Sequence, residues 1–281
     1  MNRQKRVVTS HDISCMGRCS ITVALPILSA LGIETIILPT SILSTHTSGF
    51  KNFTYLDLKD ESSKITKHWE NYEREIDAIY TGFLGSIEQI NILKEYISDK
   101  KNHTFIVVDP AMADNGSLYA IFDDSYANEM TSLCKMANLV IPNVTEACIM
   151  TKTSYLGPIQ TKEQIEQLLD KINDLGIDNI VLTSVRFEED KIGVATRTKD
   201  GTTSYYVTDE VKGYFHGTGD VFASSLVGTY LNGYPLNECA KIAAEYVIDS
   251  IKETINTSDF DPKYGVNFEL ALKDLINKVR K

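Results

Sequence analysis

The segment His216-Gly217-Thr218-Gly219-Asp220 stands directly before an apolar stretch, residues 221–227, that is typical of a buried helix. Glycines at a helix start let the backbone approach a ligand closely, and the free N–H groups and the helix dipole attract anions there. Because the same dipole favours a negative charge, we expect Asp220 to stay ionised and to be able to accept a proton from an alcohol. These residue types therefore indicate phosphoryl transfer to a hydroxyl group. The alternative is that Thr218 and Asp220 merely cap the helix, which both residue types often do.

Polar residues also follow most of the expected strands. In open α/β sheets, ligands bind beyond the carboxyl ends of the strands. The groups found there are Ser10-His11-Asp12, Ser44-Thr45-His46-Thr47, Thr81-Gly82-Phe83-Leu84-Gly85, Asp109-Pro110 with Asp114, Asn143 with Glu146, and Thr183-Ser184. We therefore expect these residues to lie along one rim of a sheet.

Four of these residues, Asp109, Asp114, Asn143 and Glu146, have oxygen ligands suited to Mg²⁺, held directly or through water. A metal ion would let a protein with a net charge of -10 bind a nucleoside triphosphate. Plainer interpretations stay open, since Asp109-Pro110 could be a turn that ends a strand and Asn143 could cap the helix that contains Glu146.

The elements that must position these residues alternate between strand and helix, which predicts a mostly parallel sheet covered by helices on both faces. We expect strands at 5–10, 34–38, 77–81, 104–109, 139–142 and 179–183, followed by an antiparallel hairpin of 193–197 and 203–207 as a mixed edge. We expect helices at 20–31, 59–73, 87–98, 129–136, 161–174, 219–232, 236–254 and 267–280. Thr161 and Gln164 form a predicted capping box. With no linker or repeat in the chain, we expect one domain over residues 1–281.

Composition excludes several classes of protein. The net charge of -10, without clustered Lys or Arg, disfavours a nucleic-acid surface. No apolar run is long enough to cross a bilayer and the first residues lack the features of a signal peptide, so we expect a cytoplasmic protein. Five scattered cysteines fit reduced thiols better than disulfides or a zinc site, and we expect Cys15 and Cys19 to be small buried packing residues.

Taken in order, these motifs resemble the ribokinase-like superfamily, and within it the vitamin B6 kinases, along essentially the whole chain. The resemblance rests on S-H-D-I-S-C-M-G-R-C-S, S-T-H-T, T-G-F-L-G-S, D-P-A-M-A-D, P-N-V-T-E and H-G-T-G-D-V-F-A-S. It implies a three-layer α/β/α sandwich and transfer of phosphate from ATP to the 5'-hydroxymethyl group of pyridoxal, pyridoxine or pyridoxamine. It also implies Mg²⁺, leaves a monovalent cation open, and suggests a homodimer.

The resemblance assigns roles to individual residues. Asp220 matches the catalytic base, and Gly217, Thr218 and Gly219 match the residues that hold the transferred phosphoryl group. The residues that match positions binding the pyridine ring are Ser10, Thr45, His46 and Phe83. Those that match positions binding ATP are Asp114, Tyr119, Asn143, Glu146, Thr183, Val211 and Phe215. Asp109 and Glu146 are the expected magnesium residues. His11 and Asp12 would face the site without a catalytic step.

Two departures from the family pattern stand out. Ala113 replaces a frequent Gly and could stiffen the nucleotide loop, and Phe83 replaces a frequent Tyr, which removes a hydroxyl contact.

Rival functions are a hydroxymethylpyrimidine kinase of thiamine synthesis and, from another class, a non-catalytic protein that binds a B6 compound or a nucleotide. Hydroxymethylpyrimidine kinases often have Cys at the position of Asp220, so Asp220, S-T-H-T and Phe83 favour the B6 kinase. A sugar or nucleoside kinase would need an early Gly-Gly motif, and a redox enzyme would need G-x-G-x-x-G after the first strand. The sequence has neither motif at these places.

Overall fold

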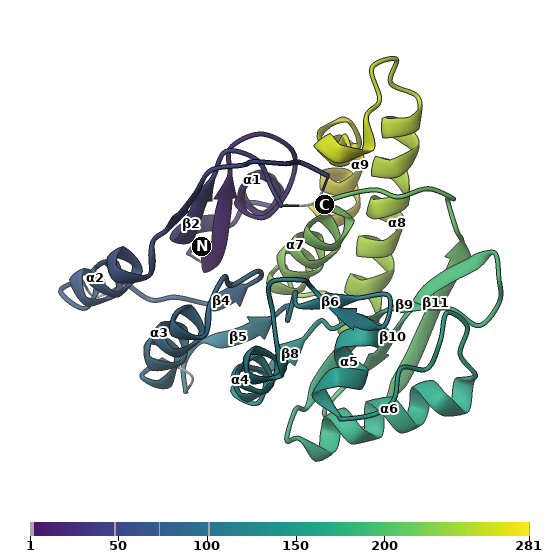
Figure 1. Ribbon diagram of the computed structural model, residues 1–281, viewed down its shortest axis with the longest axis horizontal. Coiled ribbons are helices and arrows are strands. Elements are labelled where there is room, and N and C mark those ends of the chain that lie inside the picture. Colours follow the sequence, from purple (N-terminus) through teal and green to yellow (C-terminus); the bar gives the residue numbers. More distant parts are fainter. Residues whose placement is uncertain (1–2, 48, 73, 101, 281) are drawn as a thin grey trace. The chain divides into compact units, whose positions relative to one another are not determined.

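The computed structural model describes residues 3–47, 49–72, 74–100 and 102–280. The chain forms two compact units, which we call unit 1 (Met1–Gly85 with Val211–Lys281) and unit 2 (Ser86–Glu210). In Figure 1, unit 1 contains the purple and yellow ends of the chain, and unit 2 is the teal and green middle. That the whole chain is one domain stays a prediction.

Among the described residues of unit 1, four strands pair in the order β4-β1-β2-β3. Strand β1 (Arg6–Ser14) pairs in parallel with β2 (Glu34–Leu43) and β4 (Ala78–Thr81), and β3 (Tyr55–Asp57) adds an antiparallel edge to β2. The parallel strands are rich in apolar residues because helices cover both of their faces.

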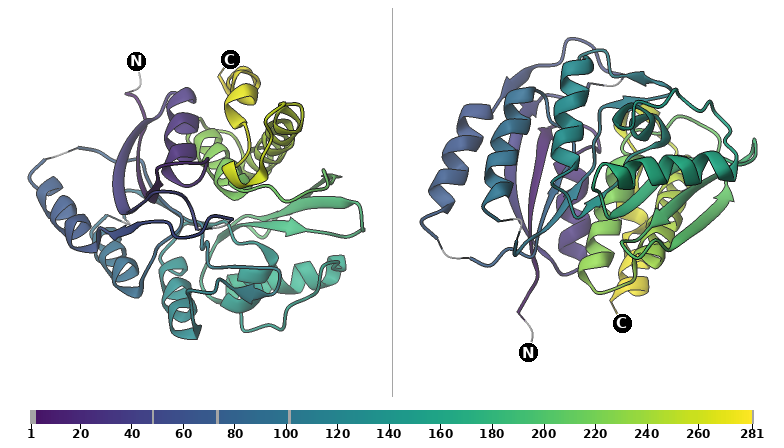
Figure 2. Two further views of the ribbon diagram at one scale, coloured as in Figure 1. Left: turned by 45° about the horizontal axis from the view of Figure 1, so that its top comes forward. Right: turned by 90° about the horizontal axis from the view of Figure 1, so that it is seen from below.

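The helices of unit 1 are α1 (Ile21–Ala30), α2 (Lys59–Trp69), α7 (Thr218–Leu231), α8 (Leu236–Ile255), α9 (Phe268–Val279) and the short 3₁₀ helix η1 (Pro262–Tyr264). Figure 2 shows α2 on one face of β1 and β2, with α1, α7, α8 and α9 on the other face. Helix α7 packs between α1 and α8 and is buried along most of its length. Unit 1 is therefore layered as helix, sheet and helix.

In the part of unit 2 that the structure describes, five strands pair in the order β5-β8-β9-β10-β11, and two further strands form a separate hairpin. Its strands are β5 (Phe105–Val108), β6 (Ala113–Asp114), β7 (Ser117–Leu118), β8 (Leu139–Val140), β9 (Asn179–Val185), β10 (Lys191–Arg197) and β11 (Thr203–Asp209). Its helices are α3 (Ile87–Ser98), α4 (Asp124–Cys134), α5 (Val144–Met150) and α6 (Lys162–Asp174). Strands β5, β8 and β9 are parallel, whereas β10 and β11 form the predicted antiparallel edge.

Each predicted strand and helix corresponds to an observed one, with shifted boundaries in several cases, whereas β3 and the β6–β7 hairpin were not predicted. Strand β1 continues through the residues expected to follow it, so Ser10, His11 and Asp12 lie inside the strand. Helix α4 begins at Asp124 because Asp123 caps it, five residues before the predicted start. The capping box of Thr161 and Gln164 is present at the start of α6. Helix α2 ends at Trp69, and the predicted end at Glu73 lies outside the described residues.

Across the described ranges, none of the helices is long and apolar enough to span a bilayer.

Helix α7, which begins within the H-G-T-G-D segment, packs closely against α1. Gly228 has no side chain, and a Cβ atom there would lie 2.4 Å from Cδ1 of Leu31 and 3.5 Å from Cδ2 of Leu28. Both leucines are buried, so they have little room to move. The glycine therefore lets the two helices approach closely.

We predict that Gly228→Val destabilises the protein by about 1–3 kcal/mol, because the added methyl groups would overlap with Leu31. Urea unfolding followed by circular dichroism measures the change. In a Leu31→Val background, where the clashing methyl group is absent, the additional loss caused by Gly228→Val should be smaller. Equal losses in both backgrounds would show that this contact does not set the distance between the helices.

Candidate active site

The amino end of α7 has no side-chain cap. Gly217 adopts a left-handed conformation, with φ of 77°, and a Cβ atom there would lie 2.3 Å from the carbonyl oxygen of Arg18. The Thr218 hydroxyl donates a hydrogen bond back to the carbonyl of Phe215 (3.3 Å), so it does not cap the helix. A Cβ atom on Gly219 would meet nothing within 4 Å. The capping interpretation is therefore wrong, and the first N–H groups of α7 stay open to an anion.

The Asp220 carboxylate lies at this helix end and receives two hydrogen bonds on the same oxygen. The backbone N–H of Ser20 donates to Oδ2 (2.9 Å), and the Cys19 thiol also donates to Oδ2 (3.3 Å). Burial raises the pKa of Asp220 to about 6, the Asp12 charge adds to this rise, and the two hydrogen bonds oppose it. We expected the helix dipole to keep this group ionised, and burial acts against that effect.

A second carboxylate, Asp12, is buried next to the first. It accepts hydrogen bonds from the hydroxyls of Ser14 (2.8 Å) and Ser20, and burial raises its pKa. Ser20 therefore links the two carboxylates, through its hydroxyl to Asp12 and through its N–H to Asp220. That Asp12 faces a substrate site stays a prediction.

Aromatic and histidine rings lie together in unit 1, next to the turn that contains Gly17. The Nε2 atom of His46 donates to the carbonyl of Lys263 (2.6 Å), and its ring centroid lies 4.9 Å from that of His216 and 5.0 Å from that of Phe50. The His46 ring also lies against Gly17, where a Cβ atom would be 3.1 Å from Cδ2. Flat rings with polar edges suit the binding of a heteroaromatic ligand.

The structure places the other predicted ring-binding residues in unit 1 as well. The Thr45 hydroxyl is buried and finds no hydrogen-bond partner among the described residues, which is the state expected of a group that binds a ligand. Ser10 is buried within β1, and its carbonyl accepts a hydrogen bond from Gly82 (3.2 Å) next to the half-buried Phe83.

His11 lies deeper than we expected. Its ring contacts Tyr80 edge-on, neither of its nitrogens has a hydrogen-bond partner in the described part of the chain, and burial lowers its pKa to about 3. It is therefore neutral at physiological pH, in line with the absence of a catalytic step for it.

In unit 2, the start of α5 holds the β6–β7 hairpin in place. Glu146 accepts hydrogen bonds from the N–H groups of Met112 (3.0 Å) and Ala113 (3.4 Å), and the Asn143 amide donates to the carbonyl of Ala113 (2.8 Å). Asn143 and Glu146 also form a capping box on α5, so the capping interpretation of Asn143 is confirmed. Asn115 and Gly116, both with positive φ, form the two-residue turn of the hairpin.

The expected nucleotide residues of unit 2 lie on or near this hairpin and the adjacent strands. Asp114 is exposed and accepts hydrogen bonds from the backbone and the side chain of Asn115 (2.9 and 3.0 Å). Tyr119 is bonded through its N–H to Met112, and Thr183 through its N–H to Pro142 (both 2.9 Å). In unit 1, Val211 precedes Phe215, whose ring stacks on Phe260 at 5.9 Å.

The two predicted magnesium residues, Asp109 and Glu146, are both close enough to Cys134 to raise the pKa of its thiol. Burial, and then the charges of Glu146 and Asp109, raise the pKa of Cys134. Both residues offer oxygen ligands of the kind that Mg²⁺ prefers, but backbone N–H groups already occupy both oxygens of Glu146. Within the described ranges, there is no group of three or more His, Cys, Asp or Glu side chains arranged to hold a metal ion. The oxygens of Asp109 and Glu146 are thus of the kind that suits Mg²⁺, and the binding of the ion by these two residues stays a prediction.

The expectation that both early cysteines are buried packing residues is wrong for Cys15, which is exposed. Cys19 is half-buried and hydrogen-bonded to Asp220. Burial raises the pKa of its thiol, and the Asp220 charge adds to the rise. It is therefore a hydrogen-bond donor rather than a thiolate.

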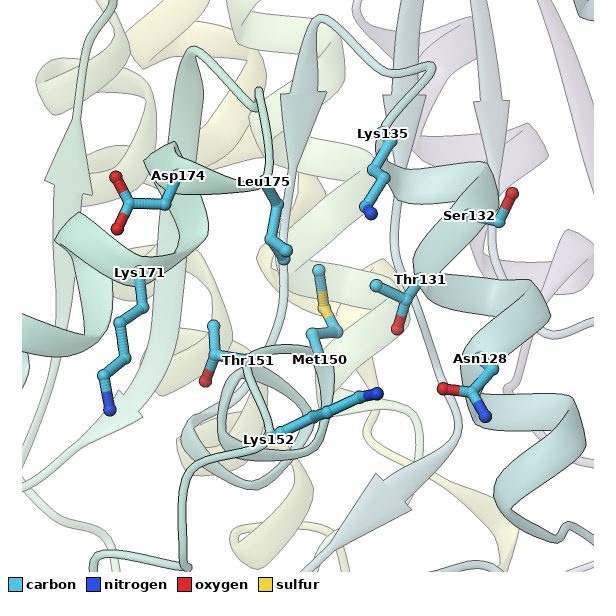
Figure 3. Close-up of a pocket in the computed structure, with 10 residues that line it drawn as sticks. All are labelled: Asn128, Thr131, Ser132, Lys135, Met150, Thr151, Lys152, Lys171, Asp174 and Leu175. Atoms are coloured by element: carbon cyan, nitrogen blue, oxygen red, sulfur yellow. The ribbon is translucent and has the colours of Figure 1, made fainter.

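Unit 2 contains a cavity of about 540 Å³. It is formed by α4, the end of α5 and α6, with Met150 and Leu175 between the side chains of Lys135, Lys152 and Lys171 (Figure 3). None of the predicted site residues lines it.

Comparison with known proteins agrees with the fold and the motifs. A crystal structure from Bacteroides thetaiotaomicron, assigned as a phosphomethylpyrimidine kinase and containing pyridoxal, is 34% identical, with a TM-score of 0.91 over 97% of this chain and 96% of that one. Pyridoxal kinase from Lactobacillus plantarum is 29% identical, with a TM-score of 0.88 over 99% of this chain and 98% of the other. The predicted α/β fold, with a mostly parallel sheet and an antiparallel edge, is confirmed.

Sequence similarity extends to a Staphylococcus aureus protein named as a candidate pyridoxine kinase, which is 28% identical over 187 residues. That match covers 66% of each of the two chains, so it spans just under two thirds of the relative's own length. A family model described as phosphomethylpyrimidine kinase matches residues 21–263. The chain therefore belongs to this kinase family, within the ribokinase-like fold.

Proposed function

We propose that this protein transfers the γ-phosphoryl group of ATP to the 5'-hydroxymethyl group of pyridoxal, pyridoxine or pyridoxamine. The observation that carries the proposal is the Asp220 carboxylate beside an uncapped helix end, where a base and an anion site meet. The pyridoxal in the Bacteroides thetaiotaomicron structure and the name of the Lactobacillus plantarum enzyme support this choice of acceptor.

In this proposal, unit 1 supplies the acceptor site and the base. Ionised Asp220 takes the proton of the acceptor hydroxyl, and the N–H groups that follow Gly217 bind the oxygens of the transferred phosphoryl group. Gly219 leaves space for those oxygens, since a Cβ atom there meets nothing within 4 Å. The pyridine ring is bound by the predicted ring residues, Ser10, Thr45, His46 and Phe83.

In this proposal the nucleotide is bound by the residues that match the family's ATP-binding positions, namely Asp114, Tyr119, Asn143, Glu146, Thr183, Val211, Phe215 and Thr218. Mg²⁺, held by Asp109 and through water by Glu146, would neutralise charge on the phosphates when bound. A monovalent cation and a homodimer remain expectations that rest on the family resemblance, and cytoplasmic residence remains an expectation that rests on the sequence features.

A hydroxymethylpyrimidine kinase is the second candidate, favoured by the description of the matching family model. Its substrate is also a flat heterocycle with a hydroxymethyl group. A non-catalytic binding protein is the third candidate, and a carboxylate positioned at the anion site disfavours it because binding alone does not need a base.

We predict that Asp220→Asn lowers kcat by about 10²–10⁴-fold, since the amide cannot accept the proton, while ATP binding changes little. ADP release should be measured with pyridoxal, pyridoxine, pyridoxamine and hydroxymethylpyrimidine in parallel, and ATP binding by calorimetry. A variant that keeps more than about a tenth of the wild-type rate would contradict the role of Asp220. Wild-type turnover of hydroxymethylpyrimidine alone would favour the second candidate.

The pH dependence follows from the raised pKa of Asp220. Only the ionised carboxylate accepts a proton, so kcat should be full above pH 7 and decline as the pH falls through about 6. Folding raises this pKa from 3.8 to about 6, so protonated Asp220 favours the folded state. This contribution to the free energy of unfolding is lost as the pH rises from 3.8 through about 6. Thermal unfolding at pH 8 should therefore find Asp220→Asn at least as stable as the wild type. A kcat that is flat down to pH 5 would exclude a base with this pKa.

A further inference from the structure

Ser20 has an unusual backbone for a serine. Its φ is 54° and its ψ is -126°, a region that non-glycine residues rarely adopt because it is strained. Serine at this position before a helix normally accepts a hydrogen bond from the first turn, but no side chain caps α1. Ser20 therefore has a strained backbone, and its side chain does not make the capping hydrogen bond that is usual for a serine at this position.

The bonds of Ser20 indicate what this geometry achieves. Its carbonyl accepts hydrogen bonds from Val23 (3.1 Å) and Ala24 (3.0 Å) in α1, and its hydroxyl donates to the buried carboxylate of Asp12. With these two groups held, the N–H of Ser20 is directed at Oδ2 of Asp220. A helix, a strand residue and one hydroxyl together fix the direction of a single N–H group.

The distribution of donors on Asp220 is uneven. Ser20 and Cys19 both donate to Oδ2, whereas Oδ1 accepts no hydrogen bond from any residue that the structure describes. A carboxylate held through one oxygen keeps the other free and aimed. This is the arrangement that a base needs if an incoming hydroxyl is to find one oxygen available.

We propose that Ser20 is a positioning residue: its hydroxyl bond to Asp12 keeps the strained backbone in place, so that its N–H holds Oδ2 of Asp220 and leaves Oδ1 for the acceptor hydroxyl. This inference rests on the proposed function, because the proposed function supplies the alcohol whose proton Asp220 accepts. In the same inference, Asp12 holds Ser20 in place by accepting the hydrogen bond from its hydroxyl.

Two substitutions at Ser20 separate this role from simple packing. Ser20→Ala loses the hydroxyl but keeps a Cβ atom, so nothing offsets the strain and the N–H should turn away from Asp220. Ser20→Gly also loses the hydroxyl, but glycine adopts positive φ without strain, so its N–H can stay in place. We expect kcat to fall about tenfold in Ser20→Ala and to recover several-fold in Ser20→Gly, with the KM for ATP unchanged within about twofold in both.

Asp12 provides the second arm of the experiment. Asp12→Ala should lower kcat as Ser20→Ala does, and the double variant should be no slower than the slower single variant, because both remove the same bond. Lys152 serves as a matched control, since it is exposed, lies in unit 2 and has a φ of 53°. Lys152→Ala and Lys152→Gly should both keep the wild-type kcat. Urea unfolding of every variant checks that the fold persists.

The outcomes separate failure of this inference from failure of the proposed function. An active wild type with Ser20→Ala at the wild-type rate, or with Ser20→Gly slower than Ser20→Ala, overturns the positioning role alone. Additive losses for Asp12→Ala and Ser20→Ala overturn the link between these two residues. A wild type that releases no ADP with any B6 compound or with hydroxymethylpyrimidine overturns the proposed function and the positioning role together.

Discussion

The open amino end of helix α7 is the constraint on which the rest of this protein depends. A helix end carries N–H groups without intrahelical acceptors, and a buried end without partners is unfavourable. Here no side chain supplies a cap, and Gly217 turns the chain into the helix against the Arg18 carbonyl, where a side chain would not fit. Near the carboxyl end of the same helix, the absence of a side chain at Gly228 lets α7 approach Leu31 closely. The arrangement is understandable if an anion completes it.

In both units, burial raises the pKa of carboxylates that hydrogen-bond donors hold in place. Asp12 and Asp220 in unit 1, and Glu146 in unit 2, all have raised pKa values because burial disfavours their charged forms. Backbone N–H groups and hydroxyls offset part of this penalty, from Ser20 and Ser14 in unit 1 and from Met112 in unit 2. Carboxylates held by N–H groups keep a fixed orientation, which suits both a base and residues that act on a metal ion through water.

Much of the fold could be predicted from the sequence, because the buried strands and the amphipathic helices have clear periodicities. The predicted ends of strands and helices were wrong where polar residues continue a strand or helix. Strand β1 runs on through His11 and Asp12, and α4 begins at a cap that precedes its apolar residues. The β6–β7 hairpin was also missed, although its Asn115-Gly116 turn is a recognised hairpin signal.

The candidate site was predictable in its residue types but not in its geometry. The segment from His216 to Asp220 is distinctive in sequence, whereas the role of Ser20 depends on a positive φ and on contacts with Asp220, 200 positions away. No periodicity reveals either of these. The fate of Cys15 and Cys19, one exposed and one bonded to Asp220, likewise depends on how the turn after β1 folds.

A crystal structure of the protein with pyridoxal and a non-hydrolysable ATP analogue would test the central claim most directly. We predict that the oxygen of the hydroxymethyl group lies within about 3.2 Å of Oδ1 of Asp220, with phosphate oxygens at the N–H groups that follow Gly217. A complex in which the hydroxymethyl group points away from Asp220, or in which the phosphates bind elsewhere than the amino end of α7, would contradict the account.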